Sequence, residues 1–223
     1  MSGEFGPKKQ QNPPPKKPIL QFRHLASLAI TAILAASGMV SIEDIAFAVF
    51  SIIYVYFLSK VAFPLLNNPS MRPSVFGRDN KILGAYVVFA AIIGLFLPIA
   101  YICDGIFEGD KEGIKAAAPH LFLLASQVFM EGFAFSSRFS LPISVFVPVF
   151  YNSRRIFTIV DWLRSEFSKV DEGYGGSARR LYIGRGLAIA NMVLWCFNLF
   201  AFLLPVYLPR AFKIYYSGSK VKD

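Results

Sequence analysis

Apolar stretches separated by short polar segments dominate the chain, and five of them predict helices that cross a membrane. They lie at residues 24–40, 45–66, 82–103, 120–138 and 187–208. A membrane-spanning helix needs about 20 mainly apolar residues, and residues 82–103 contain no charged side chain. The pattern predicts an all-α membrane protein, a helical bundle of four to five transmembrane helices.

The first two predicted spans are separated by very few residues. Ser41, followed three residues later by Asp44, resembles a helix start in which the serine side chain caps free backbone N–H groups. Because the connection is so short, we expect these two spans to form an antiparallel hairpin.

Residues 139–151 are apolar but are interrupted by Pro142 and Pro148. A straight helix of this length, rising about 1.5 Å per residue, does not cross about 30 Å of hydrocarbon. The segment is therefore predicted to be re-entrant or to lie at the membrane interface.

From residue 153 the apolar residues follow the helical period. Residues 153–170 predict an amphipathic helix on the membrane surface, with a basic polar face that favours an anionic leaflet. Its key positions are Arg154 and Arg155 on the polar face, Trp162 at the edge, and Leu163 and Phe167 in the apolar stripe.

Composition places the chain among membrane proteins. Hydrophobic residues make up 55% of the 223 residues, charged residues only 17%, and the mean hydropathy is +0.49. A soluble domain of this size has too little interior for so much apolar surface. The formal net charge of +9 is explained by the positive-inside rule, so no nucleic-acid partner is expected. The expected partners are the lipid bilayer and other membrane proteins or a second copy of the chain.

The ends of the chain differ from its middle. Residues 1–20 predict a disordered, basic, Pro-rich tail, residues 21–209 a single transmembrane domain, and residues 210–223 a basic C-terminal tail. Counting Lys and Arg on each side favours a cytoplasmic N-terminus and four or five spans over six. The same count predicts that residues 67–81 and the helix at 153–170 share the cytoplasmic face, opposite the acidic segment at 104–119.

Polar residues inside the predicted spans are the candidate functional residues. Gln127 and Glu131 lie four residues apart and share one face of a helix, and an acid within a span usually faces the bundle interior. We expect Lys60 and Glu131 to form an ion pair with Asn191 as a hydrogen-bond partner. The alternatives are that Lys60 extends to the headgroups and that Glu131 is protonated or pairs with Arg138. The whole predicted cluster is Lys60, Gln127, Glu131, Arg138, Asn191 and Asn198.

The sequence predicts neither an enzyme nor a cofactor or metal site. His24 and His120 are far apart in the chain, and no zinc-protease, serine-hydrolase or Asp-rich metal motif occurs. Cys103 and Cys196 are poorly placed to form a disulfide.

The C-terminal half carries a resemblance. The order Gln127-Val-Phe-Met-Glu131, Val145-Phe-Val-Pro148-Val-Phe-Tyr, Arg154-Arg155 and a last span ending in Leu204-Pro-Val-Tyr-Leu-Pro-Arg-Ala-Phe-Lys-Ile-Tyr-Tyr216 resembles a known membrane-protein family. This family comprises endoplasmic-reticulum and nuclear-envelope proteins that bind reticulons and associate with nuclear pores. The whole chain also resembles uncharacterised plant multi-pass membrane proteins. The resemblance implies a non-enzymatic, membrane-organising protein of the endoplasmic reticulum.

Two functions follow as expectations. The first is a membrane-organising or adaptor protein, for which the hairpin and the surface helix argue. The second is a small-solute transporter or channel with an intramembrane site at Lys60 and Glu131. Whether these polar side chains meet at a cavity distinguishes the two.

Overall fold

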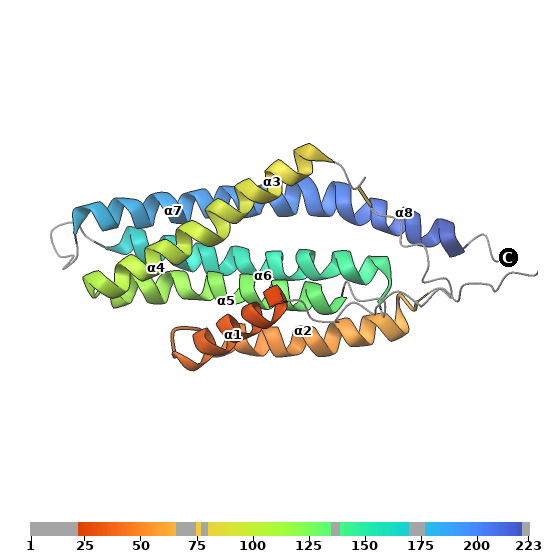
Figure 1. The fold of residues 1–223 in the computed structure, drawn as a ribbon, viewed down its shortest axis with the longest axis horizontal. Coiled ribbons are helices and arrows are strands. Elements are labelled where there is room, and N and C mark those ends of the chain that lie inside the picture. The colour runs from red at the N-terminus through yellow and green to blue at the C-terminus, as the bar shows by residue number, and fades with distance from the viewer. Residues whose placement is uncertain (1–21, 66–74, 77–79, 135–138, 170–176, 220–223) are drawn as a thin grey trace, which may run out of the picture.

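The structure, a computed structural model, describes residues 22–65, 75–76, 80–134, 139–169 and 177–219. All secondary structure in these ranges is helical (Figure 1). The elements are α1 (Phe22–Ala36), α2 (Ile42–Val61), α3 (Lys81–Ala91), η1 (Ile92–Phe96), α4 (Leu97–Glu108), α5 (Lys111–Ala134), α6 (Leu141–Ser168), α7 (Ala178–Cys196), η2 (Phe197–Tyr207) and α8 (Leu208–Ser219).

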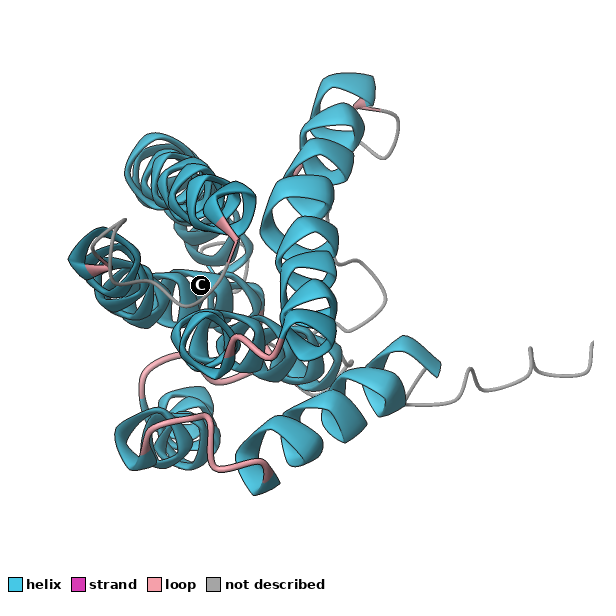
Figure 2. Ribbon diagram, turned by 90° about the vertical axis from the view of Figure 1, so that its left-hand side faces the viewer, coloured by secondary structure: helices cyan, strands magenta, loops and turns pink. Residues whose placement is uncertain are grey.

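Two long helices form the centre of the bundle. α5 and α6 pack against each other along their lengths. α1 and α4 cover α5, α7 and α8 cover α6, and α2 contacts both central helices. Figure 2 shows most of these helices end-on, so that they form one bundle.

The outer helices are more apolar than the central pair. Three helices are long and apolar enough to cross a membrane: Ile42–Val61, Lys81–Glu108 and Ala178–Gly218. Large apolar side chains such as Ile53, Val88 and Val193 are exposed on their outer surfaces, whereas α5 and α6 bury His120, Arg155 and Glu166. This reversal of the soluble pattern is typical of a membrane protein, because lipid solvates the outside and polar groups face inward.

The two longest outer helices each contain a π-helical segment, η1 and η2. The π-segments do not end these helices, which continue as Lys81–Glu108 and Ala178–Gly218. The last helix therefore passes Pro205 without reversing its direction. Gly94 of η1 lies against the indole of Trp195 of α7. A Cβ on that glycine would be only 2.6 Å from Trp195 Cζ2.

The start of α2 follows the prediction. Ser41 is extended (φ −67°, ψ 153°), and its side chain accepts a hydrogen bond from the Asp44 N–H at 3.2 Å. Gly38 takes a positive φ of 71° in the preceding turn, a conformation that costs glycine little. This confirms the predicted capped helix start.

The prediction for residues 139–170 is wrong. A re-entrant segment followed by a surface helix was expected, but both belong to one continuous helix, α6. Pro142 lies in the first turn, where proline is favoured, and only Pro148 interrupts the helix interior. Arg155 and Trp162 are fully buried, Leu163 is half-buried and Phe167 is 56% exposed. The packed face of this stretch is thus not the predicted apolar stripe, because α5 and α7 contact α6 and bury its polar side chains.

The two ends of the bundle are distinguished by the helices that begin and end there. At the end where α4 meets α5 near Gly109, α6 ends and α7 begins; we call this the paired end. At the other end, which we call the basic end, α2 and α8 end and α3 and α6 begin, as Figure 1 shows. The Ser140 hydroxyl donates to the Phe63 carbonyl there at 2.8 Å.

Most of residues 67–81 lies outside the described residues, so the predicted sharing of one face with residues 153–170 can be checked only at Lys81 and Lys169, which lie at opposite ends of the bundle. Lys169, just after α6, has its Nζ 3.9 Å from Asp110 at the paired end, whereas α3 begins with Lys81 at the basic end. The predicted face assignment treated the arginines of α6 and α7 as unpaired charges.

Candidate functional site

The structure divides the predicted polar cluster. Gln127 and Glu131 lie together on α5, and Gln127 Nε2 donates to Glu131 Oε1 at 2.7 Å. Lys60 lies exposed on α2, with its Nζ 5.6 Å from the ring centroid of Tyr56. The expected Lys60–Glu131 ion pair is therefore not formed, since the buried face of α2 carries Ser51, Val55 and Ser59 and Lys60 points elsewhere. Arg138 lies outside the described residues.

The two asparagines bond to other partners. Asn191 Nδ2 donates to the carbonyls of Ile93 and Leu187, and Asn191 Oδ1 accepts from the indole N–H of Trp195 at 3.2 Å. Asn198 Oδ1 accepts from the Tyr86 hydroxyl at 2.9 Å. Asn191 thus links α7 to the π-segment η1 rather than to Glu131.

Arg155 takes the place that was expected for Lys60. It is fully buried, and its Nη2 donates to Gln127 Oε1, so that Gln127 connects Arg155 to Glu131. Its guanidinium carbon lies 4.1 Å from the ring centroid of Trp195, a stacking geometry favourable for arginine. We call Arg155, Gln127, Glu131 and Trp195 the central cluster.

Buried polar atoms of Arg155, and of His120 and Asn152 beside Trp195, lack a hydrogen-bond partner among the described residues. Arg155 Nε and Nη1, His120 Nδ1 and Asn152 Oδ1 make no hydrogen bond within the described residues. Each unpaired buried polar atom costs about 1–3 kcal/mol, more for a charged group. A buried guanidinium with one direct hydrogen bond and no directly bonded carboxylate is therefore an unusual feature that bound water or a ligand would relieve.

A cavity of about 630 Å³ adjoins the central cluster; we call it the central cavity. Its walls come from α1, α3, α5 and η2 and are mainly apolar, with Ala90, Leu124, Val128 and Phe202 among them. Gln127, Glu131 and Trp195 line it as well, so three of the four members of the central cluster reach its surface. Its volume lies within the range of about 300–1,000 Å³ typical of small-molecule sites, as does the combination of apolar walls with few polar groups.

A second buried arginine, Arg180, organises the paired end. Arg180 Nε donates to Asp110 at 2.7 Å, and Nη1 donates to Asp104 at 3.1 Å and to the Tyr101 carbonyl at 3.0 Å. Its guanidinium carbon lies 4.1 Å from the Tyr101 ring centroid. Arg180 is fully buried and Asp110 nearly so. This arginine ties α7 to α4 and to the turn before α5.

Glu166 and Lys169 continue this ionic network onto α6. Lys169 Nζ donates to Glu166 at 2.9 Å, and the Tyr101 hydroxyl donates to the other Glu166 oxygen at 2.9 Å. Arg185 of α7 donates to the backbone carbonyls of Glu166 and Lys169. We call Tyr101, Asp104, Asp110, Glu166, Lys169 and Arg180 the paired-end network.

Glycines make room for the paired-end network. A Cβ at Gly105 would clash with the guanidinium of Arg180 and would lie 2.8 Å from Ile114 Cγ1. A Cβ at Gly184 would lie 2.6 Å from Glu166 Oε2 and 2.7 Å from the Tyr101 hydroxyl. The helices can approach closely enough for these ion pairs because neither position carries a side chain.

Sequence reasoning missed this network because Asp104, Asp110 and Arg180 were placed outside the predicted spans and Glu166 and Lys169 on a surface helix. The structure instead continues α4 to Glu108 and begins α7 at Ala178. A usable signal existed: the acids at 104, 108 and 110 are complemented by Arg179 and Arg180. Complementary charges at the ends of predicted spans indicate pairing as well as topology.

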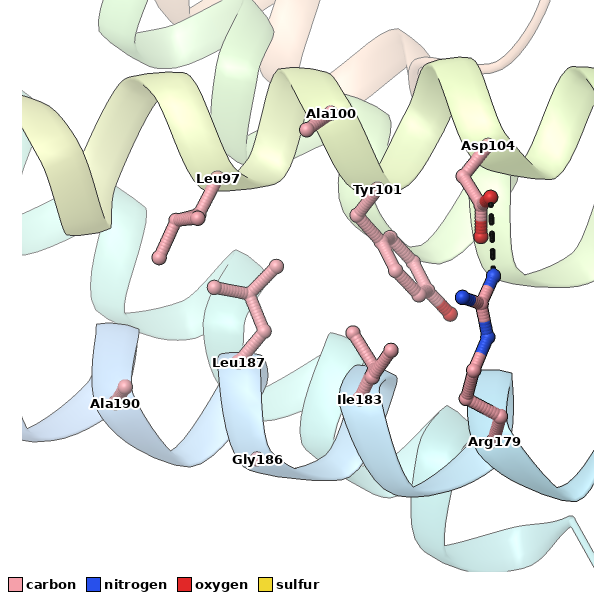
Figure 3. Close-up of a pocket in the computed structure, with 9 residues that line it drawn as sticks. All are labelled: Leu97, Ala100, Tyr101, Asp104, Arg179, Ile183, Gly186, Leu187 and Ala190. Atoms are coloured by element: carbon pink, nitrogen blue, oxygen red, sulfur yellow. Dashed lines mark hydrogen bonds and ion pairs between the residues drawn. The ribbon is translucent and has the colours of Figure 1, made fainter.

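A groove of about 540 Å³ separates α4 from α7 next to this network (Figure 3). Leu97, Tyr101 and Leu187 project into the space between the two helices, and the pair Asp104–Arg179 closes one side. We call this the α4–α7 groove. Among the described residues, no group of three or more His, Cys, Asp or Glu side chains is arranged to hold a metal ion.

Comparison with known proteins gives one match. A family model described as a domain of unknown function, DUF7733, matches residues 20–216. No curated protein and no solved structure matches the chain. The comparisons thus lend no support to the link with pore-associated proteins that the C-terminal half suggested.

Proposed function

Because the chain belongs to the DUF7733 family, whose description assigns no activity, its function has to be inferred from its own residues. We propose that it is an integral membrane protein that binds an amphipathic small molecule in the central cavity and carries or transports it. One observation carries this proposal: an apolar cavity between outer helices ends at Gln127 and Glu131, which connect to the fully buried Arg155.

The chemistry of the central cavity suits an amphipathic ligand. Its apolar walls would accept a hydrocarbon portion, and Gln127, Glu131 and Asn198 at its surface would orient a polar group. Ionisable residues inside a membrane protein are costly and mark substrate or ion pathways. If Arg155 and Glu131 had only a structural role, no cavity would be needed beside them.

This proposal takes up the second expectation from the sequence in altered form. Glu131 keeps its role, and Arg155 replaces Lys60 as the basic group near it. A membrane-organising scaffold receives less support, because that expectation depended on a surface helix. Arg155 and Trp162, which were expected on that helix, belong to α6 and are buried.

The test uses fluorescence of Trp195, which lines the cavity. Full-length protein in detergent would be titrated with nitroxide-labelled single-chain amphiphiles that carry an ammonium, a hydroxyl or a carboxylate head. Saturable quenching by at least one of them is expected. Trp162, the second of the two tryptophans, contributes a background common to all variants.

A matched pair of variants on α3 makes the result specific. Ala90→Phe fills the central cavity, whereas Ala85→Phe adds the same volume on an exposed part of the same helix outside the cavity. Saturable quenching should be lost in Ala90→Phe and kept in Ala85→Phe. If folded Ala90→Phe binds every probe as the unmodified protein does, the central cavity is not the binding site.

We also propose a topology of six crossings with both termini in the cytoplasm. At the basic end, Lys60 lies in the last turn of α2, Lys81 begins α3, and α8 contains Arg210 and Lys213. The flanking sequence adds the lysines of both tails. Several of the arginines that argued against six spans are paired with acids, as in Arg154–Asp44 and Arg180–Asp110. Paired charges weigh less in the positive-inside rule than unpaired ones, so the basic end is assigned to the cytoplasm.

Inserted glycosylation sites would test this topology. A site inserted at Gly109 should be modified, and one inserted between residues 67 and 74 should not. The reverse pattern would place the basic end outside the cytoplasm. The endoplasmic reticulum remains the proposed membrane, on the strength of the C-terminal resemblance, and a fluorescent fusion viewed beside an organelle marker would test it.

A further inference from the structure

The α4–α7 groove is held open by two close helix contacts. At one end Gly94 lies against Trp195, and at the other Gly105 lies against Arg180. A side chain on either glycine would push the helices apart. Between these contacts, the helices leave a space of about 540 Å³, so the groove is preformed.

Small residues leave space in the groove between the two helices. Ala100 on α4 and Gly186 and Ala190 on α7 lie along it, and Tyr101 and Leu187 are buried at its base. Figure 3 shows the side chains of Leu97, Ile183 and Leu187 projecting into the interhelical space. The surface of the groove is thus apolar along most of its length.

The mouth of the groove carries opposite charges. Arg179 Nη2 lies 3.4 Å from Asp104 Oδ1 and 3.6 Å from Glu108 Oε1. The side chains of Arg179 and Asp104 are 68% and 40% exposed, so both charges can reach a bound molecule. A cation and two carboxylates stand side by side where the apolar surface ends.

From these features we infer that the α4–α7 groove binds one zwitterionic phospholipid. An acyl chain occupies the apolar groove, Arg179 binds the lipid phosphate, and Asp104 with Glu108 binds the ammonium group. Charge complementarity selects this occupant, because a phosphate and an ammonium in one headgroup match the paired signs at the mouth. The groove lies between two helices apolar enough to cross a membrane, so lipid reaches it laterally from the bilayer.

This site is separate from the central cavity. None of the residues that form the mouth or the walls of the groove lines the cavity beside Glu131. A negative result for lipid binding in the groove would therefore leave the proposed carrier function unaffected, and the reverse also holds.

Native mass spectrometry of the full-length protein would test the inference. The protein would be stripped of lipid in detergent and titrated with short-chain phosphatidylcholine, phosphatidylethanolamine or phosphatidylglycerol. One tightly bound phosphatidylcholine or phosphatidylethanolamine is expected, with weaker phosphatidylglycerol binding, because the glycerol head lacks the ammonium group.

Variants locate the bound lipid. Ala100→Phe and Ala190→Phe fill the groove and should weaken binding by about tenfold or more, since they displace the apolar contact of the chain. Arg179→Gln should weaken binding of both zwitterionic lipids while thermal stability stays unchanged, because its present ion pairs are exposed. Ala85→Phe, on an exposed part of α3 outside the groove, serves as the matched control and should bind as the unmodified protein does.

Three results would overturn the inference. Retained binding by folded Ala100→Phe and Ala190→Phe would exclude the groove as the lipid site. Equal affinity for phosphatidylglycerol would exclude recognition of the zwitterion by Asp104 and Arg179. Absence of a bound phospholipid in the stripped and titrated protein would exclude a specific lipid site altogether.

Discussion

Two fully buried arginines have similar aromatic neighbours but different hydrogen-bond partners. Each stacks on an aromatic ring with its guanidinium carbon 4.1 Å from the centroid, Arg155 on Trp195 and Arg180 on Tyr101. Arg180 is bonded to two aspartates and a backbone carbonyl. Arg155 is bonded to Gln127 alone, and its Nε and Nη1 have no partner among the described residues.

This difference separates a structural charge from a functional one. A buried charge is tolerated when it is paired and hydrogen-bonded. Arg180 is paired with two carboxylates, and only its Nη2 lacks a hydrogen-bond partner among the described residues. The central cluster meets that condition only in part and lies beside a cavity. This contrast supports a stabilising role for the paired end and the ligand-binding role that we propose for the central cluster.

The largest expected effect concerns Asp110. Asp110→Asn keeps the shape of the side chain but removes the carboxylate that Arg180 Nε contacts at 2.7 Å. Because Asp104 still pairs with Arg180 and Glu166 with Lys169, the loss of unfolding free energy should lie near the lower end of the about 3–5 kcal/mol that breaking a buried ion pair costs. Denaturant or thermal unfolding in detergent measures it. Asp161→Asn is the control, because its pair with Arg164 is exposed and worth about 0–1 kcal/mol. Similar losses in both variants would show that the paired-end network has no special role.

A smaller effect is expected from the glycine that admits Arg180. Gly105→Ala places a methyl group against the Arg180 guanidinium and Ile114, and overpacking of this kind costs about 1–3 kcal/mol. Gly84→Ala on α3 meets nothing within 4 Å and should stabilise its helix by about 0.5–1 kcal/mol. Thermal unfolding of the two variants should move in opposite directions; a shift of the same sign would argue against close packing at Gly105.

The smallest effect tests which basic group is coupled to Glu131. Lys60→Met and Glu131→Gln should have additive effects within about 0.5 kcal/mol, because Lys60 is exposed and contacts Tyr56 instead. A double-mutant cycle on unfolding free energy measures this. A coupling well above that limit would show that Lys60 and Glu131 interact.

Several elements could be predicted from the sequence, and their signals were local. The apolar stretches at 45–66 and 82–103 correspond to α2 and to the helix Lys81–Glu108, and the Ser41 cap follows from residue type and spacing alone. Glu131 and Gln127 were recognised as neighbours because they lie four residues apart on one helix. These inferences needed no knowledge of how the helices pack.

The inferences that failed depended on packing. Whether residues 139–170 lie on the membrane or inside the bundle is decided by which helices contact α6, and its helical period alone cannot show that. Arg155 was assigned to a polar surface for the same reason, although it is fully buried. The pairing of Arg180 with Asp110 joins residues far apart in the chain, and only the bundle brings them together.

The most direct test compares Arg155→Met with Arg180→Met in thermal unfolding of the full-length protein in detergent. Methionine fills part of the space of arginine without charge. Arg180→Met should lose about 3–5 kcal/mol, because it removes the closest cation of the buried Asp110, whose other cation among the described residues, Lys169, lies 3.9 Å away. At about 2–4 °C per kcal/mol this lowers Tm by roughly 6–20 °C. Arg155→Met should lose only about 1–2 kcal/mol of unfolding free energy. It leaves Gln127 Oε1 without its hydrogen-bond donor, but it also removes a buried charge that makes few hydrogen bonds. Equal losses in the two variants would contradict the division between a structural and a functional arginine.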